Sequence, residues 1–88
     1  REVEDSLVAV ETLKRQVAAV DRQARAARNA RELSKDRYDQ GITSYLEVLE
    51  TERQLFSAEL DLSELKQLQL SAYVALYKAL GGGWVTEE

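Results

Sequence analysis

Two glutamates three residues apart, Glu47 and Glu50, are the side chains whose type and spacing first suggest chemistry. Residues three apart share one face of a helix, so both carboxylates would lie together there. The chain contains no cysteine and no histidine, which excludes disulfides, thiol nucleophiles and the usual zinc ligands. No catalytic triad and no phosphate-binding loop is present either. We therefore predict no enzyme, no catalytic residue, no metal site and no cofactor.

A structural explanation of Glu47 comes from the residues just before it. Ser44 is a good helix N-cap and Glu47 follows three residues later, which is the pattern of a capping box. The same charge lies in the first turn, where the helix dipole favours an acid. Upstream, Gly41 can adopt the left-handed conformation that ends a helix, and Ile42 can supply the apolar contact of that cap. These signals predict one helix ending and another beginning within a few residues.

The pattern around these signals predicts an all-α fold, an antiparallel two-helix hairpin of coiled-coil type. Residues 1–39 form helix one, 40–44 the tip turn, 45–80 helix two and 81–88 a glycine-rich tail. The short connection leaves the second helix little choice but to return beside the first. A single uninterrupted helix is the competing geometry, because one glycine costs only about 1 kcal/mol inside a helix. The apolar stripe of helix one consists of Val3, Leu7, Val10, Leu13, Val17, Val20, Ala24, Ala27 and Leu33.

Helix two carries more apolar side chains than one partner can cover. One seam contains Leu46, Leu49, Phe56 and Leu60, and a second contains Val48, Leu55, Leu62 and Leu76. Folding against helix one buries only one of these sides. We therefore expect the other side to contact further helices, from the same assembly or from other parts of a longer chain.

Composition excludes several other classes of protein. The chain is 44% hydrophobic and 32% charged with a net charge of −4, which does not suggest a nucleic-acid binder. No apolar run approaches the roughly 18 residues of a transmembrane helix, so we expect no membrane-spanning segment. Because the chain begins at Arg1 without methionine, we expect it to be a fragment of a longer protein.

Two motifs at the right separation resemble a known family. Tyr38, Gly41, Leu46, Val48, Leu49, Leu55 and Ala58 resemble the second periplasmic helix-turn-helix of TolC-type outer-membrane efflux channels. The ending Leu76-Tyr77-Lys78-Ala79-Leu80-Gly81-Gly82-Gly83-Trp84 is similar to the end of the returning helix in the multidrug-efflux branch. The resemblance covers nearly the whole chain. It implies a homotrimer whose protomers build an outer-membrane β-barrel and a periplasmic α-barrel, with this hairpin at the periplasmic tip.

The resemblance also assigns roles to residues at the tip. Gly41, Ile42, Thr43 and Ser44 would dock the helical hairpins of a periplasmic adaptor (membrane fusion) protein, which links the channel to an inner-membrane pump. Glu47 and Glu50 match positions where family members carry acidic gate residues at the closed tunnel entrance. Six carboxylates around a three-fold axis would attract cations and favour partial protonation by like-charge repulsion. The channel itself would be passive, because the pump supplies the energy.

The other polar and aromatic residues have ordinary structural explanations. Tyr38 and Tyr45 flank the tip and should pack on a neighbouring helix, and Trp84 should pack back onto the end of helix two. The arginines of helix one should be solvated or paired with neighbouring acids; they are Arg15, Arg22, Arg25, Arg28, Arg31 and Arg37.

Two alternatives stay open from the residues alone. One is a structural or interaction coiled coil, such as the hairpin of a periplasmic adaptor. The other is a soluble helical signalling module, which leaves the Gly-Gly-Gly-Trp ending unexplained.

Overall fold

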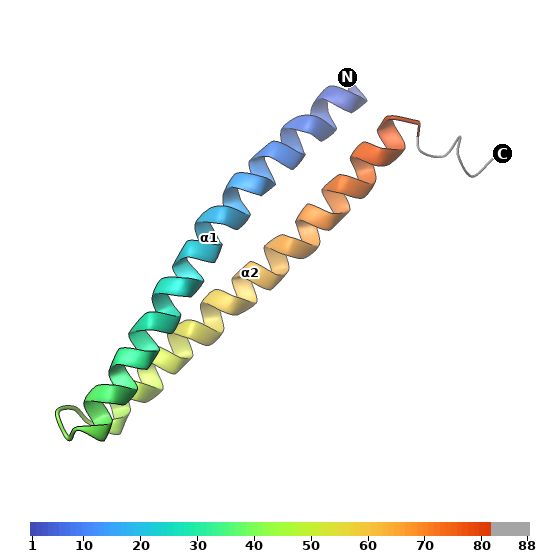
Figure 1. Ribbon diagram of the computed structural model, residues 1–88. Helices are drawn as coiled ribbons and strands as arrows, with labels where there is room; N and C mark the ends of the chain where they lie inside the picture. The colour runs from blue at the N-terminus through green and yellow to red at the C-terminus, as the bar shows by residue number, and fades with distance from the viewer. Residues whose placement is uncertain (82–88) are drawn as a thin grey trace.

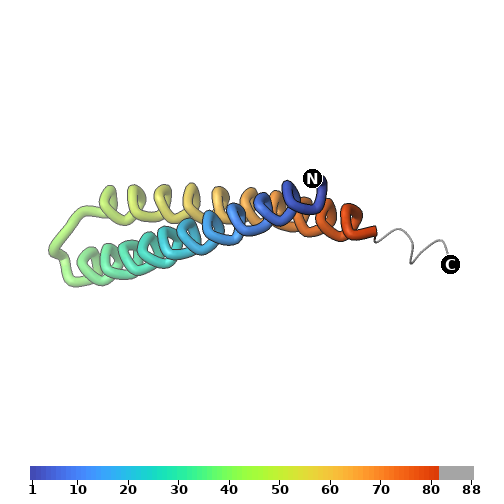
Figure 2. Tube along the Cα trace, turned by 90° about the horizontal axis from the view of Figure 1, so that it is seen from above, coloured from blue at the N-terminus to red at the C-terminus, as the bar shows by residue number. Residues whose placement is uncertain are grey.

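The computed structural model describes residues 1–81 and consists of two long helices joined by a tight turn (Figure 1). Helix α1 spans Glu2–Asp39 and helix α2 spans Tyr45–Ala79. The helices run antiparallel along their length, so residue 1 and the end of α2 lie at the same end of the molecule (Figures 1 and 2). The predicted all-α hairpin is confirmed, and a single uninterrupted helix is excluded. Trp84, Gly82 and Gly83 lie outside the described residues.

The contact between the helices follows a strict seven-residue repeat on each of them. In α1 the positions turned toward the partner are 3, 10, 17, 24 and 31, with 6, 13, 20, 27 and 34 between them. In α2 they are 48, 55, 62, 69 and 76, with 51, 58, 65, 72 and 79. All twenty are buried or half-buried. A strict heptad repeat is the seam of a coiled coil, because it keeps one face of each helix turned to the other.

The register of this repeat corrects the predicted stripe of α1. Leu7 and Leu33 were assigned to it, but both are exposed, and Leu33 keeps 61% of its accessible surface. The heptad places Ser34, which is 2% exposed, at the contact position instead of Leu33. A serine can be buried there because its hydroxyl donates a hydrogen bond to Glu47 of α2.

The core of the hairpin is thin. The buried apolar side chains within residues 1–81 are Val10, Ala24, Val48 and Leu55. Ala24 is 1% exposed, since a small side chain lets the facing helix approach closely. Two packed helices can bury no more than one stripe each, so the remaining apolar surface stays exposed.

The predicted excess of apolar surface on α2 is confirmed. The seam through Val48 and Leu55 faces α1. A second series lies along the outer side, where positions alternating by three and four are apolar except for the polar residues Arg53, Ser63 and Gln67. Its apolar members are Leu46, Leu49, Phe56, Leu60, Leu70, Val74 and Tyr77, all of them exposed. We call these seven residues the outer stripe. Its spacing is also that of a coiled-coil seam, but no helix of the described chain covers it.

Candidate functional site at the hairpin tip

The turn that joins the helices is fixed by backbone hydrogen bonds. The N–H of Gly41 donates to the Tyr38 carbonyl at 2.9 Å, and the N–H of Ile42 donates to the Arg37 carbonyl at 2.8 Å. This pair of bonds is a Schellman motif, which needs a left-handed residue just past the helix end. Gly41 has a φ of 77°, so the predicted glycine stop is confirmed. We call residues 40–44 the tip loop; Gly41, Ile42 and Ser44 are exposed and Thr43 is half-buried.

Ser44 is the N-cap residue of helix α2, as predicted, but the predicted capping box is wrong. Ser44 has an extended backbone, and its carbonyl accepts the Glu47 N–H at 3.2 Å, yet its side chain makes no capping hydrogen bond. The Glu47 carboxylate instead binds side chains of α1 and of the tip loop. These partners compete with the cap because one is a guanidinium, and hydrogen bonds between ions are stronger than neutral ones.

Glu47 accepts three side-chain hydrogen bonds. Its Oε1 accepts from the Thr43 hydroxyl at 2.8 Å, and its Oε2 accepts from the Ser34 hydroxyl at 3.2 Å and from Arg37 Nε at 3.1 Å. The Thr43 hydroxyl is the largest cause of a lowered pKa of Glu47, and Arg37 and Ser34 lower that pKa further against the opposing effect of desolvation. Glu47 is therefore a bound carboxylate in this chain.

Glu50 has a different environment, although it lies only three residues further along α2. Its carboxylate accepts from Arg53 Nη2 at 2.6 Å and from Gln54 Nε2 at 2.9 Å, both on the same helix. The Arg53 hydrogen bond is the main cause of a lowered pKa of Glu50, and Gln54 adds to it. Partial protonation was expected for both acids from clustering around a three-fold axis. In the single chain both pKa values are lowered, that of Glu47 first by the Thr43 hydroxyl and that of Glu50 first by Arg53. The effect of a three-fold arrangement on them stays a prediction.

The two tyrosines that flank the turn pack against each other. The rings of Tyr38 and Tyr45 have centroids 5.2 Å apart and an interplanar angle of 62°, an edge-to-face arrangement. Both remain partly exposed. Sequence reasoning expected each to contact a neighbouring helix but missed their mutual contact. Their positions just before and just after the tip loop are the signal that could have revealed it.

The arginines of α1 divide as expected into exposed and paired side chains. Arg28 binds Glu59 of α2 at 3.0 Å, and Arg25 binds Asp21 of its own helix at 2.9 Å. All four side chains are substantially exposed, where such pairs contribute little to stability.

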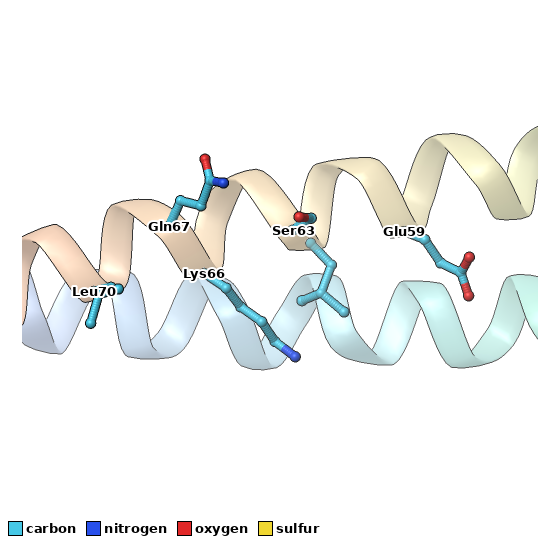
Figure 3. Close-up of a pocket in the computed structure, with 6 residues that line it drawn as sticks. Glu59, Ser63, Lys66, Gln67 and Leu70 are labelled. Atoms are coloured by element: carbon cyan, nitrogen blue, oxygen red, sulfur yellow. The ribbon is translucent and has the colours of Figure 1, made fainter.

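An open groove of about 460 Å³ lies along α2, far from the tip (Figure 3). Its lining side chains all come from that helix: Glu59, Leu62, Ser63, Lys66, Gln67 and Leu70. A groove walled by one helix is a feature of the outer surface and not an enclosed site. Within residues 1–81 no three acidic side chains gather as a metal site would require. Neither α1 nor α2 has a stretch long and apolar enough to cross a membrane.

A long helical hairpin with a fixed tip, a second apolar stripe and no reactive cluster among its described residues is typical of an element within a larger helical assembly. Comparison with known proteins identifies the family. The profile of the family described as outer membrane efflux protein matches residues 1–82. This chain belongs to the outer membrane efflux protein family.

Individual relatives agree with the family match. The solvent efflux pump outer membrane protein SrpC of Pseudomonas putida is 43% identical over 84 residues, which is 96% of this chain. The pyoverdine export outer membrane protein OpmQ of Pseudomonas aeruginosa is 40% identical over 98% of this chain. The cation efflux system protein CusC of Escherichia coli is 36% identical over 96%. The chain spans about 18% of the length of each of these relatives. The family match thus argues against the alternative that this chain is the hairpin of a periplasmic adaptor.

Proposed function

We propose that this chain forms the periplasmic tip of a trimeric outer-membrane channel in a tripartite multidrug efflux system. In this role residues 41–44 dock a periplasmic adaptor, while Glu47 and Glu50 lie at the tunnel entrance. The observation that carries the proposal is the family match over residues 1–82 of a chain that folds as one hairpin with an exposed, fixed tip. The channel is passive, and the inner-membrane pump drives transport through the adaptor.

The tip loop has the properties of a docking surface. Its backbone is fixed by the hydrogen bonds of Gly41 and Ile42, so little conformational entropy is lost when a partner binds. Ile42 presents an apolar side chain that is 59% exposed, beside the small polar residues Thr43 and Ser44. An exposed apolar side chain with a polar surround is the composition of a small protein contact.

The outer stripe supports the place of the hairpin in a barrel wall. A helix in such a wall has a neighbour on each side, and α2 carries one coiled-coil seam toward α1 and a second one on its outer side. Exposed seams of this length are costly in water unless another helix covers them. The proposed trimer, with helices from the rest of each protomer, supplies those neighbours.

The gate role depends mainly on Glu50. Its carboxylate is held only by residues of α2, and the side chain keeps half of its accessible surface. Three copies around an axis would place three such carboxylates at one constriction and attract cations. Glu47 belongs to the same entrance by its position, and each glutamate has an arginine partner, Arg37 for Glu47 and Arg53 for Glu50. The difference is that Glu47 is tied to α1 and the tip loop, whereas the partners of Glu50 lie on its own helix.

Cross-linking between channel and adaptor tests the docking role. Ile42→Asp, in the longer protein that carries this segment, should abolish cross-linking of the tip to the adaptor and raise drug sensitivity. The matched control is Val8→Asp, since Val8 is equally exposed but lies at the opposite end of the hairpin. Normal cross-linking of Ile42→Asp, or an equal loss in both variants, would overturn the proposal.

A further inference from the structure

Hydrogen bonds between the side chains of the two helices are concentrated near the tip. Among the residues that the structure describes, three such bonds join α1 to α2, and two of them end on Glu47. The third joins Arg28 to Glu59. Within residues 1–81, no side-chain hydrogen bond joins the part of α1 from Glu2 to Ala27 to α2. The helices are therefore tied by directional contacts only toward the loop.

Glu47 also ties the tip loop to both helices. Its Oε1 holds the Thr43 hydroxyl, in the loop, while its Oε2 holds Ser34 and Arg37, on α1. Arg37 contacts the loop a second time, because its carbonyl accepts the Ile42 N–H. One carboxylate thus connects the last turns of α1, the loop and the first turn of α2. A chain segment held at several points has fewer accessible conformations.

Burial strengthens these contacts. Ser34 is almost fully buried in the seam, so its hydroxyl needs a partner, and Glu47 Oε2 provides it. Removal of the Glu47 carboxylate would leave that hydroxyl without this partner and would free Arg37 and Thr43. The lost hydrogen bonds would loosen mainly the loop, because Thr43 lies in it and the Arg37 carbonyl, in the last turn of α1, accepts the Ile42 N–H.

We propose that Glu47 is the positioning residue of the docking surface: its carboxylate latches Thr43, Arg37 and Ser34 so that residues 41–44 are held in one conformation for the partner. The proposal rests on the docking role given above and assigns Glu47 a function distinct from lining the gate. Glu50, which binds only Arg53 and Gln54, has no part in the latch.

Amide hydrogen exchange tests the latch without any partner. Glu47→Gln keeps the shape of the side chain and removes its charge, and Glu50→Gln makes the same change one turn further along α2. We expect exchange at Gly41 and Ile42 to accelerate about tenfold in Glu47→Gln and less than twofold in Glu50→Gln. Thr43→Val removes one of the three donors and should give a smaller acceleration. Equal exchange in the two glutamine variants would overturn the proposal.

Adaptor capture by the same variants separates this inference from the docking role. If the latch and the docking role are both correct, Glu47→Gln weakens capture of the adaptor and Glu50→Gln leaves it unchanged. Faster exchange in Glu47→Gln, with no adaptor capture by the wild type or by any variant, would contradict the docking role and support the latch. Unchanged exchange in Glu47→Gln, with normal adaptor capture by the wild type, would support the docking role and contradict the latch.

Discussion

The ring of Tyr38 meets the ring of Tyr45 edge to face across the hairpin, with centroids 5.2 Å apart. The contact joins the last turn of α1 to the first residue of α2, directly beside the tip loop. Together with the latch of Glu47, it gives the tip a second contact that does not depend on charge. The tip is therefore held both by an aromatic pair and by a bound carboxylate.

The tyrosine pair should show a measurable coupling. Replacing either Tyr38 or Tyr45 by leucine removes the edge-to-face contact, so the two losses of stability should not add. In a double-mutant cycle of denaturant unfolding we expect a coupling free energy of about 0.5–1.5 kcal/mol. A pair with no such contact, Tyr38 and Tyr73, serves as the control. Additive losses for Tyr38 and Tyr45 would show that the rings do not stabilise each other.

Substitution of two leucines of α2 distinguishes the seam covered by α1 from the outer stripe. Leu55 is 8% exposed against α1, whereas Leu60 is 49% exposed on the outer side. Leu55→Ala should lower the free energy of unfolding of the single chain by about 2–3 kcal/mol, and Leu60→Ala by less than about 0.5 kcal/mol. Thermal unfolding followed by circular dichroism measures both. In the proposed trimer Leu60→Ala should become costly as well, because a neighbouring helix would then cover Leu60.

The Glu47 latch should make stability depend on acid pH. The pKa of Glu47 is lowered in the folded chain, first by the Thr43 hydroxyl and then by Arg37 and Ser34, so folding favours the ionised carboxylate. Its contribution is complete above the ordinary glutamate pKa of about 4.3 and is lost as pH falls through the lower folded value. The difference in melting temperature between wild type and Glu47→Gln should therefore shrink as the solution is acidified below about pH 4.3. Parallel pH profiles for the two proteins would contradict this assignment.

The proposed gate predicts a cation effect at Glu50. In single-channel recordings of the longer protein, Glu50→Gln should raise conductance through the closed channel or weaken its block by divalent cations. The reason is that three negative charges disappear from the entrance. Glu64→Gln is the matched control, since Glu64 is exposed on the same face two heptads further along α2. If both variants conduct alike, the entrance is not lined by Glu50.

The sequence predicted the helices and the turn because their signals are local. The Gly41 stop and the Ser44 start depend on backbone conformations that single residues favour, and both were found where expected. The apolar excess of α2 was equally visible, since its count exceeds what one partner helix covers. The family resemblance needed only the tip pattern and the glycine-rich ending, and the comparisons support it.

Only the tertiary structure decided how the hairpin seam is filled and what Glu47 does. A capping box and a cross-helix latch use the same residue, and the spacing of Ser44 and Glu47 cannot distinguish them. Arg37 and Ser34 lie 10 and 13 residues before Glu47, and they reach it only because the turn folds α2 back on α1. The same folding sets the register that buries Ser34 and exposes Leu33. Local conformation could thus be predicted from the chain, while the partners of each side chain depended on how two distant segments align.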